Sequence, residues 1–383
     1  MSNHQSLKSL ARMHGISLRR PSADGSTAPV NDSTLRKLLS ALKVATDDIG
    51  QSPPSADCYL PPELKDRPVW GISLQLYELR SARNWGIGDF ADLWAFADIA
   101  GPLGADFIGL NPLHAPFVAD PGRCSPYEPS NRRFLNPFYI AVDAVDGFVG
   151  NPALSDRLEQ LRAEEMVDYK QVAATKLDAL RGIWRTGQGG PGDAAFDAFV
   201  EEGGDGLHLH ALFEAISASM TEQGRGAGWH GWPSSYQSPS DAVVVEFAQA
   251  HADDVLFHKW LQWQAHLQLD KAKNLAKAAG MNIGLYLDLA VGEALDGSAT
   301  WGEPDIYVSG ASIGNPPEPF ATEGQDWRLA ALLPDAIAEG DQSPFYKLLA
   351  AAMRYAGAIR IDHAAALSRL FLVPTSGVPA DGT

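Results

Sequence analysis

The sequence predicts an α/β fold: a partial (β/α)8 barrel with about four of the eight strands visible and a large, mainly helical insertion after strand 2. Strand patterns alternate with helical patterns, which favours parallel βα units. Each strand pattern has one apolar face and one mixed face with a polar residue at its carboxyl end, where a barrel places its chemistry. A doubly wound open sheet remains the structural alternative.

The first 50 residues predict a small helical appendage. Residues 32–43 place leucines at helical spacing behind an Asp or Ser cap. Paired prolines then interrupt regular structure. We therefore expect an appendage over residues 1–50, a linker over 51–68 and a catalytic region over 69–383.

Four segments in the catalytic region have the alternation of a strand, in which successive side chains point to opposite faces. The segments are residues 69–77, 106–111, 283–289 and 357–363. One face of each is apolar. The other face carries Gly71, Ser73, Gln75, Tyr77, Gly109, Asn111, Gly284, Tyr286, Asp288, Arg360 and Asp362.

Helical patterns at residues 90–100 and 255–279 separate the strands. The span between the second and third strands is far longer than one crossover helix requires, so we expect an inserted subdomain over about 114–280. It contains a turn-rich aromatic piece at 228–233. This piece is typical of a binding loop and equally of a packed aromatic corner.

The composition is that of an ordinary folded protein, with 45% hydrophobic and 20% charged residues. The net charge of −17 disfavours binding to nucleic acid or an anionic membrane and suits a neutral substrate, although acidity also serves solubility. Cys58 and Cys124 cannot form a disulfide framework, and neither a signal peptide nor a membrane span is visible. We expect a cytoplasmic protein.

Two aspartates are the strongest candidates for chemistry. Arg360 and Asp362 share a strand face, and a neighbouring cation favours the ionised carboxylate. Asp288 ends the mixed face of the preceding strand, so both carboxylates would project into one barrel cavity. Retaining chemistry at a glycosidic bond needs a carboxylate nucleophile and a second carboxyl group. Each aspartate alone could equally be a structural ion pair.

Two aromatic residues are candidates for sugar stacking. Tyr127 follows the second strand in a loop, and Trp327 ends an apparently irregular segment, 314–327, after the third. The structural alternatives are a turn residue and a loop anchor. Dinucleotide, phosphate-loop and zinc-helix motifs are absent, so the sequence implies no cofactor and no metal.

Five segments together resemble the amylomaltase, or disproportionating enzyme, family of bacterial 4-α-glucanotransferases. They are residues 70–89, 110–114, 125–132, 284–291 and 360–363, and they occur in the family's order. The resemblance implies transfer of α-1,4-glucan segments between maltooligosaccharides by a retaining double displacement. Glucans derived from starch or glycogen would be substrates, and glucose would be an acceptor.

The resemblance also assigns roles residue by residue. It makes Asp362 the nucleophile, Arg360 its charge partner, and Asp288 and His363 contacts to the reacting sugar. It places Tyr127 against that sugar.

Three further residues complete the implied substrate contacts. The resemblance makes Trp327 and the loop from Asn315 contacts to the acceptor. Ser125, in the same motif as the stacking tyrosine, is expected to contact substrate.

The chain departs from the family pattern at its end. The family's acid/base glutamate and a third aspartate follow the Arg-x-Asp-His strand, but residues 364–383 hold Asp381 and no glutamate. We therefore expect a sequence truncated at its C-terminus and incomplete for catalysis as it stands.

Two other functions remain open. An α-amylase-type hydrolase shares the Arg-x-Asp pair, although Asp288 is followed here by Leu-Ala-Val-Gly-Glu rather than by Asn-His. A noncatalytic glucan-binding remnant would use Tyr127 and Trp327 without turnover.

Overall fold

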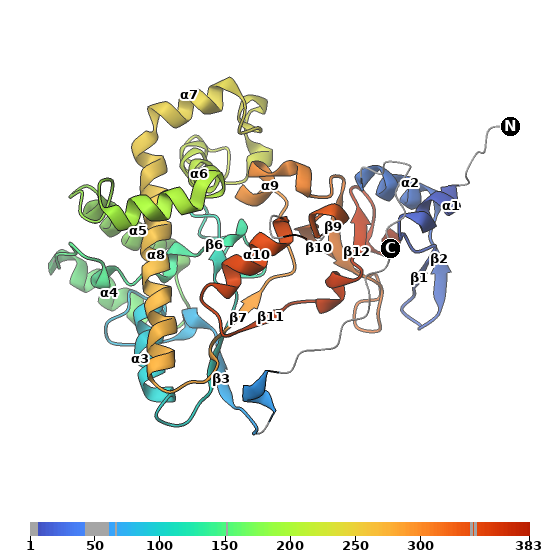
Figure 1. Cartoon of the computed structure of the whole chain (residues 1–383). Helices are drawn as coiled ribbons and strands as arrows, with labels where there is room; N and C mark the ends of the chain where they lie inside the picture. The colour runs from blue at the N-terminus through green and yellow to red at the C-terminus, as the bar shows by residue number, and fades with distance from the viewer. Residues whose placement is uncertain (1–6, 43–60, 66, 151, 338–339, 341–342) are drawn as a thin grey trace.

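The structure is a computed structural model of the chain, and it describes residues 7–42, 61–65, 67–150, 152–337, 340 and 343–383. Two four-stranded sheets, one parallel and one antiparallel, form its framework. Figure 1 shows the long helices beside the parallel sheet, and the N-terminal elements beside the antiparallel one.

The parallel sheet contains all four predicted strands. They are β3 (Gly71–Leu74), β4 (Phe107–Leu110), β7 (Gly284–Leu289) and β11 (Ala358–Ile361). Each pairs with the next along the chain, in the spatial order β11-β7-β4-β3. The prediction of parallel strands is therefore confirmed, and no strand in this sheet reverses the order.

Helices α3 (Phe90–Ala100) and α8 (Ala252–Ala278) lie side by side against this sheet (Figure 1). Helix α3 begins at a capping box, because the Asp89 carboxylate accepts from the first turn and Asp92 accepts from the Asp89 amide. The buried core between helices and sheet includes Leu93, Ala97, Ile108, Trp260, Leu269 and Leu285.

Between β4 and β7 the described chain is mainly helical. Its strands are β5 (His114–Ala115) and β6 (Asn131–Leu135), and its α-helices besides α8 are α4 (Pro152–Ala163), α5 (Tyr169–Trp184), α6 (Ala194–Glu222) and α7 (Ala242–Ala250). Helix α6 is kinked at Gly204, whose φ is 50°. Trp232 is buried and packs near Phe213 and Trp301, so the aromatic piece at 228–233 forms a packed corner.

The antiparallel sheet corrects one prediction. Segment 314–327 was expected to be irregular, but its two ends belong to β9 (Ala311–Asn315) and β10 (Gln325–Ala330), which pair antiparallel, whereas residues 316–324 lie outside both strands. Glycines and prolines in the connection hid the hairpin, because they give no strand alternation. The outer strands are β12 (Phe371–Pro374) beside β9 and β8 (Glu293–Ala294) beside β10.

The N-terminal residues pack on the antiparallel sheet. They form α1 (Leu7–Met13), a hairpin of β1 (Arg19–Pro21) and β2 (Thr27–Pro29), and α2 (Asp32–Ala41). The predicted helix is confirmed, whereas the hairpin was not predicted. The buried contacts join Leu35 and Leu38 to Ile313 and Leu372. Most of the proposed linker, 51–68, lies outside the described residues.

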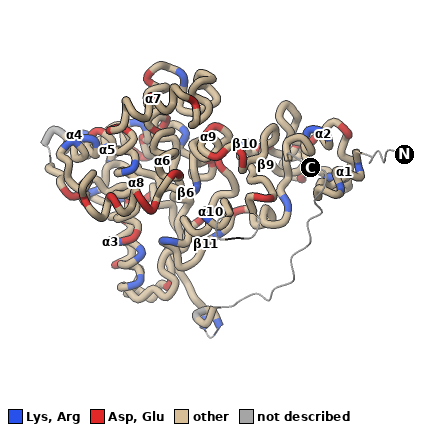
Figure 2. Tube along the Cα trace, turned by 45° about the horizontal axis from the view of Figure 1, so that its top comes forward, with Lys and Arg blue, Asp and Glu red and all other residues tan. Residues whose placement is uncertain are grey.

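Two short helices complete the described fold: α9 (Ser298–Gly302), after β8, and α10 (Pro344–Met353), before β11. Within the described part of the chain, no helix is both long and apolar enough to cross a membrane. Figure 2 shows acidic and basic residues interspersed along the long helices.

Candidate active site

A pocket of about 240 Å³ lies over the mixed face of the parallel sheet. All four strands contribute residues that the alternation had assigned to that face. We call this the strand-end pocket, and its lining includes Ser73, Gln75, Gly109, Asn111, Tyr286, Asp288 and Arg360. The predicted two-faced design of the strands is therefore confirmed.

One guanidinium joins the two candidate aspartates. Arg360 on β11 is the registered neighbour of Asp288 on β7. Its Nη1 donates to Asp288 Oδ2 at 3.1 Å, and its Nη2 donates to Asp362 Oδ1 at 3.1 Å. The two carboxylates, 74 positions apart in sequence, thus share one cation, as the alternation of β11 predicts.

Tyr127 completes this cluster from the loop between β5 and β6. Its phenol donates to Asp288 Oδ2 at 2.9 Å, the same oxygen that Arg360 contacts. The other oxygen, Asp288 Oδ1, is buried and has no hydrogen-bond partner among the described residues. The side chain therefore keeps one acceptor free beside the pocket.

The environment shifts the ionisation of these groups. Burial raises the pKa of the Asp288 carboxyl above its ordinary value, against the Tyr127 hydrogen bond and the Arg360 charge, which lower it. Burial and the bond to Asp288 raise the pKa of the Tyr127 phenol, so it remains a donor at neutral pH. Asp288 also raises the pKa of Arg360, which stays charged. One permanent cation therefore faces two carboxyl groups.

Two predicted residues meet at the edge of this cluster. The His363 ring contacts Trp327 edge-on, with centroids 5.3 Å apart and an interplanar angle of 87°. His363 follows Asp362 directly and has a left-handed backbone, with φ 49°. The hairpin of β9 and β10 therefore reaches the chain next to the candidate nucleophile.

Five of the predicted site residues do not line the strand-end pocket: Asp362, His363 and Trp327, described above, and Asn315 and Ser125. Asn315 ends β9 opposite Gln325. The Ser125 hydroxyl lies 3.4 Å from the Tyr127 amide and lines a small separate crevice with His114. The structure brings together Tyr127, Asp288, Arg360 and Asp362, but it does not bring Asn315 or Ser125 into the strand-end pocket.

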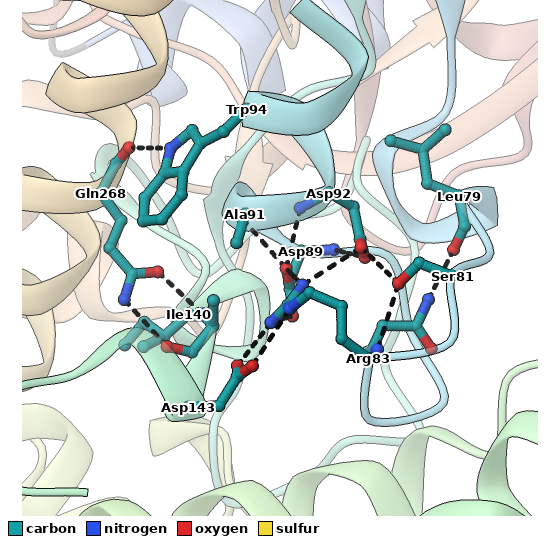
Figure 3. Close-up of polar contacts among 12 residues, drawn as sticks. Leu79, Ser81, Arg83, Asp89, Ala91, Asp92, Trp94, Ile140, Asp143 and Gln268 are labelled. Carbon is teal, nitrogen blue, oxygen red and sulfur yellow. Dashed lines mark hydrogen bonds and ion pairs between the residues drawn. The ribbon is translucent and has the colours of Figure 1, made fainter. Parts of the chain in front are cut away.

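The loop after β3 supplies further pocket residues and is held by an ionic network (Figure 3). Arg83 donates to Asp89 at 2.6 and 3.0 Å, to Asp143 at 2.5 Å and to Asp92 at 3.1 Å. Asp89 is fully buried and also caps α3. The network therefore fixes the path of the chain from β3 into α3, and with it one wall of the pocket.

Sequence reasoning did not single out three polar residues of the pocket: Gln75, Glu78 and Asn111. Gln75 and Asn111 had been placed on the mixed faces, so their position at the carboxyl ends of strands was a signal that could have identified them. The Asn111 side chain already has partners within the protein, because its Oδ1 accepts from the Leu76 backbone amide and its Nδ2 donates to the Tyr139 hydroxyl. Gln75 and Glu78 are candidates for polar contact with a ligand.

The chain is similar to known proteins over most of its length. The family model described as 4-alpha-glucanotransferase matches residues 74–382. A 4-alpha-glucanotransferase of Haemophilus influenzae is 35% identical over 343 residues, covering 85% of this chain and 49% of the relative. One of Mycobacterium tuberculosis is 38% identical over 343 residues, covering 85% and 46%. The chain thus spans about half the length of these curated relatives.

Solved structures agree with the fold. The crystal structure of amylomaltase from Corynebacterium glutamicum has a TM-score of 0.78 at 26% identity, covering 98% of this chain and 68% of that one. Amylomaltase from Streptococcus agalactiae in complex with acarbose has a TM-score of 0.71 at 18% identity, covering 83% and 64%. This second likeness concerns the fold alone. Because the family model matches most of its residues, the chain belongs to the 4-alpha-glucanotransferase family.

Proposed function

We propose that this protein acts as a 4-α-glucanotransferase, moving α-1,4-glucan segments from one maltooligosaccharide to the 4-hydroxyl of another glucan or of glucose. The observation that carries the proposal is the single guanidinium of Arg360, which lines the strand-end pocket with Asp288 and is shared by Asp288 and Asp362. Membership of the family supports the same reaction class.

In the proposed reaction, Asp362 attacks the anomeric carbon of the donor, and the bond from that carbon to the leaving glucan oxygen breaks. The leaving oxygen takes a proton from the acid/base carboxyl group that this reaction class requires, and a covalent glycosyl-enzyme remains. The 4-hydroxyl of the acceptor then attacks the same carbon, gives its proton to that acid/base group and releases Asp362. Arg360 donates a hydrogen bond to the nucleophile and orients it throughout.

The neighbouring residues are proposed to bind the sugar. Asp288 Oδ1, which lacks a partner among the described residues, accepts from a sugar hydroxyl, and the Tyr127 ring stacks on the sugar's C–H face. His363 contacts the reacting sugar. Trp327 and the loop that begins at Asn315 hold the acceptor and disfavour attack by water.

Ser125 is proposed to act next to this group. Its hydroxyl lies close to the backbone amide of Tyr127, so it orients the loop that carries the stacking ring.

The parallel sheet is proposed to be part of a (β/α)8 barrel. Strand order supports this, because successive strands neighbour one another without the reversal that marks a doubly wound sheet. The domain limits remain proposals: an appendage at 1–50, a linker at 51–68 and the barrel region at 69–383. A cytoplasmic location and an absence of nucleic-acid or membrane partners also remain predictions.

Incubation of this chain with maltotriose tests the proposal, with the Mycobacterium tuberculosis relative assayed in parallel. Glucose plus a ladder of longer glucans indicates transfer. Products that are only shorter than maltotriose would indicate hydrolysis and contradict the proposal. If no products form, calorimetric titration with maltotetraose shows whether the chain binds glucan. Failure to bind would also contradict the proposed function. Binding without products is the result expected if the chain is incomplete for catalysis.

A further inference from the structure

The backbone directly after Asp288 is held by the buried side chain of Arg132 and the partly buried side chain of His114. Arg132 Nη1 donates to the carbonyl of Ala290 at 2.9 Å and to that of Val291 at 3.0 Å. The Ala290 amide donates to His114 Nε2 at 3.3 Å. Both polar groups of Ala290, two residues beyond the pocket carboxylate, therefore have side-chain partners rather than strand partners.

Arg132 is fixed in turn by a buried carboxylate. It is 6% exposed and Glu293 is 2% exposed. Arg132 Nη2 donates to Glu293 Oε2 at 2.9 Å, and Arg132 Nε lies 2.9 Å from Glu293 Oε1. A buried ion pair is weak evidence for net stability, because desolvation offsets much of the attraction. The Nη2–Oε2 hydrogen bond and the bonds to the two backbone carbonyls instead define where the guanidinium lies, whereas Nε makes no hydrogen bond among the described residues.

His114 acts in this arrangement as an acceptor. Burial, with the nearby charge of Arg132, lowers its pKa to about 3. The imidazole is therefore neutral at physiological pH, and one ring nitrogen is free to accept. That nitrogen is the one facing the Ala290 amide.

The same region holds the loop that carries Tyr127. Ser130 Oγ accepts from the Ser298 amide at 2.9 Å, and the Ser130 carbonyl accepts from the Ala299 amide at 3.1 Å. The Pro129 carbonyl accepts from the Ala294 amide at 2.8 Å. Residues 129–132, which follow the phenol, are thus attached to the chain that follows Asp288.

We infer that Arg132, with Glu293 and His114, positions Asp288 and Tyr127 against each other and so sets the hydrogen bond that shapes the sugar site. We call these three residues the positioning cluster. None of them lines the strand-end pocket, so they act through the backbone of residues 290 and 291. The inference that the positioning cluster orients Asp288 and Tyr127 depends only on these contacts. The effect of the cluster on sugar binding rests on the proposed function.

The neighbouring residue offers a matched control. Arg133 follows Arg132 on β6 but pairs with Glu303, a different carboxylate from the one that binds Arg132. R132K and R133K therefore make the same substitution at adjacent positions. E293Q and E303Q are the corresponding pair on the carboxylate side. Lysine keeps the charge but cannot supply the several directed donors of a guanidinium.

The first readout is the pKa of Tyr127 in protein labelled with 3-fluorotyrosine, followed by ¹⁹F NMR. Y127F assigns the signal, and the half-exposed Tyr346 is an internal reference. R132K and E293Q should lower the Tyr127 pKa, because the phenol loses a bond to a charged acceptor. R133K and E303Q should leave it unchanged.

The second readout is affinity for maltotetraose by calorimetry. R132K and E293Q should bind about tenfold more weakly than the parent, whereas the control variants should match it. Because the ¹⁹F readout needs no ligand, the positioning of Tyr127 and the proposed binding of sugar are tested independently. If the parent does not bind maltotetraose but the Tyr127 pKa still falls in R132K and E293Q, the proposed function is wrong and the role of the positioning cluster is supported.

Three results would overturn the inference. An unchanged Tyr127 pKa in R132K and E293Q would do so, as would an equal shift in R133K and E303Q. If R132K does not fold, E293Q decides. Loss of the fold in both, with both controls folded, would assign the pair a purely structural role.

Discussion

Glu214 should make the stability of this protein fall as pH rises. It lies on α6 and is 1% exposed within an apolar cluster that includes Phe213 and Trp301. One carboxyl oxygen accepts from the Val118 amide at 3.3 Å, and the other has no partner among the described residues. Burial raises its pKa to about 8. The group is therefore mainly protonated at neutral pH.

The magnitude follows from linkage. Because the folded pKa of Glu214 is raised from 4.5 to about 8, its contribution is fully present below pH 4.5 and is lost as pH rises through 8. Each unit of difference corresponds to about 1.4 kcal/mol, so full ionisation costs about 5 kcal/mol. E214Q removes the titrating group but keeps an acceptor for the Val118 amide.

Urea unfolding followed by circular dichroism at several pH values tests this. The free energy of unfolding of E214Q, minus that of the parent, should grow by about 1.4 kcal/mol per pH unit between about pH 5 and 8. E201Q is the control, because Glu201 is exposed on the same helix. A difference for E214Q that stays constant over this range would refute the reasoning.

Two further predictions concern buried and site cations. R360K should weaken maltotetraose binding at least about tenfold by calorimetry, because a lysine cannot bridge both carboxylates. It should change the unfolding free energy by less than about 1 kcal/mol, because Arg360 is half-exposed. Unchanged affinity would contradict this prediction. K176M should lower the free energy of unfolding by about 2–5 kcal/mol in urea titrations, because the buried ammonium donates to the Phe138 and Ile140 carbonyls at 2.7 and 2.9 Å. K170M, at an exposed position of the same helix, should cost little, and equal losses would count against the argument.

The parts of the site that alternation controls could be predicted from sequence. Side-chain period alone put Arg360 and Asp362 on one face, and Asp288 on the facing row of another strand. The structure joins all three. The same reasoning placed Gln75 and Asn111 on the pocket face without recognising them as lining residues.

The parts that depend on distant pairing could not be predicted. Arg132 and Glu293 lie 161 positions apart, and nothing local in either segment indicates a buried pair. Strands β9 and β10 were missed because prolines and glycines interrupt the sequence between them. In both cases the structure depends on pairing with a residue or strand that is distant in sequence, which the local sequence pattern does not indicate.

Asp362 is proposed to be the nucleophile of a sugar site. Labelling with 5-fluoro-α-maltosyl fluoride tests it most directly, because fluoride leaves without a protein acid and the 5-fluorine slows release of the adduct. Peptide mass spectrometry should locate one glycosyl group on Asp362, and D362N should remain unlabelled. An adduct on Asp288 instead, or no adduct under conditions where maltotetraose binds, would contradict the account.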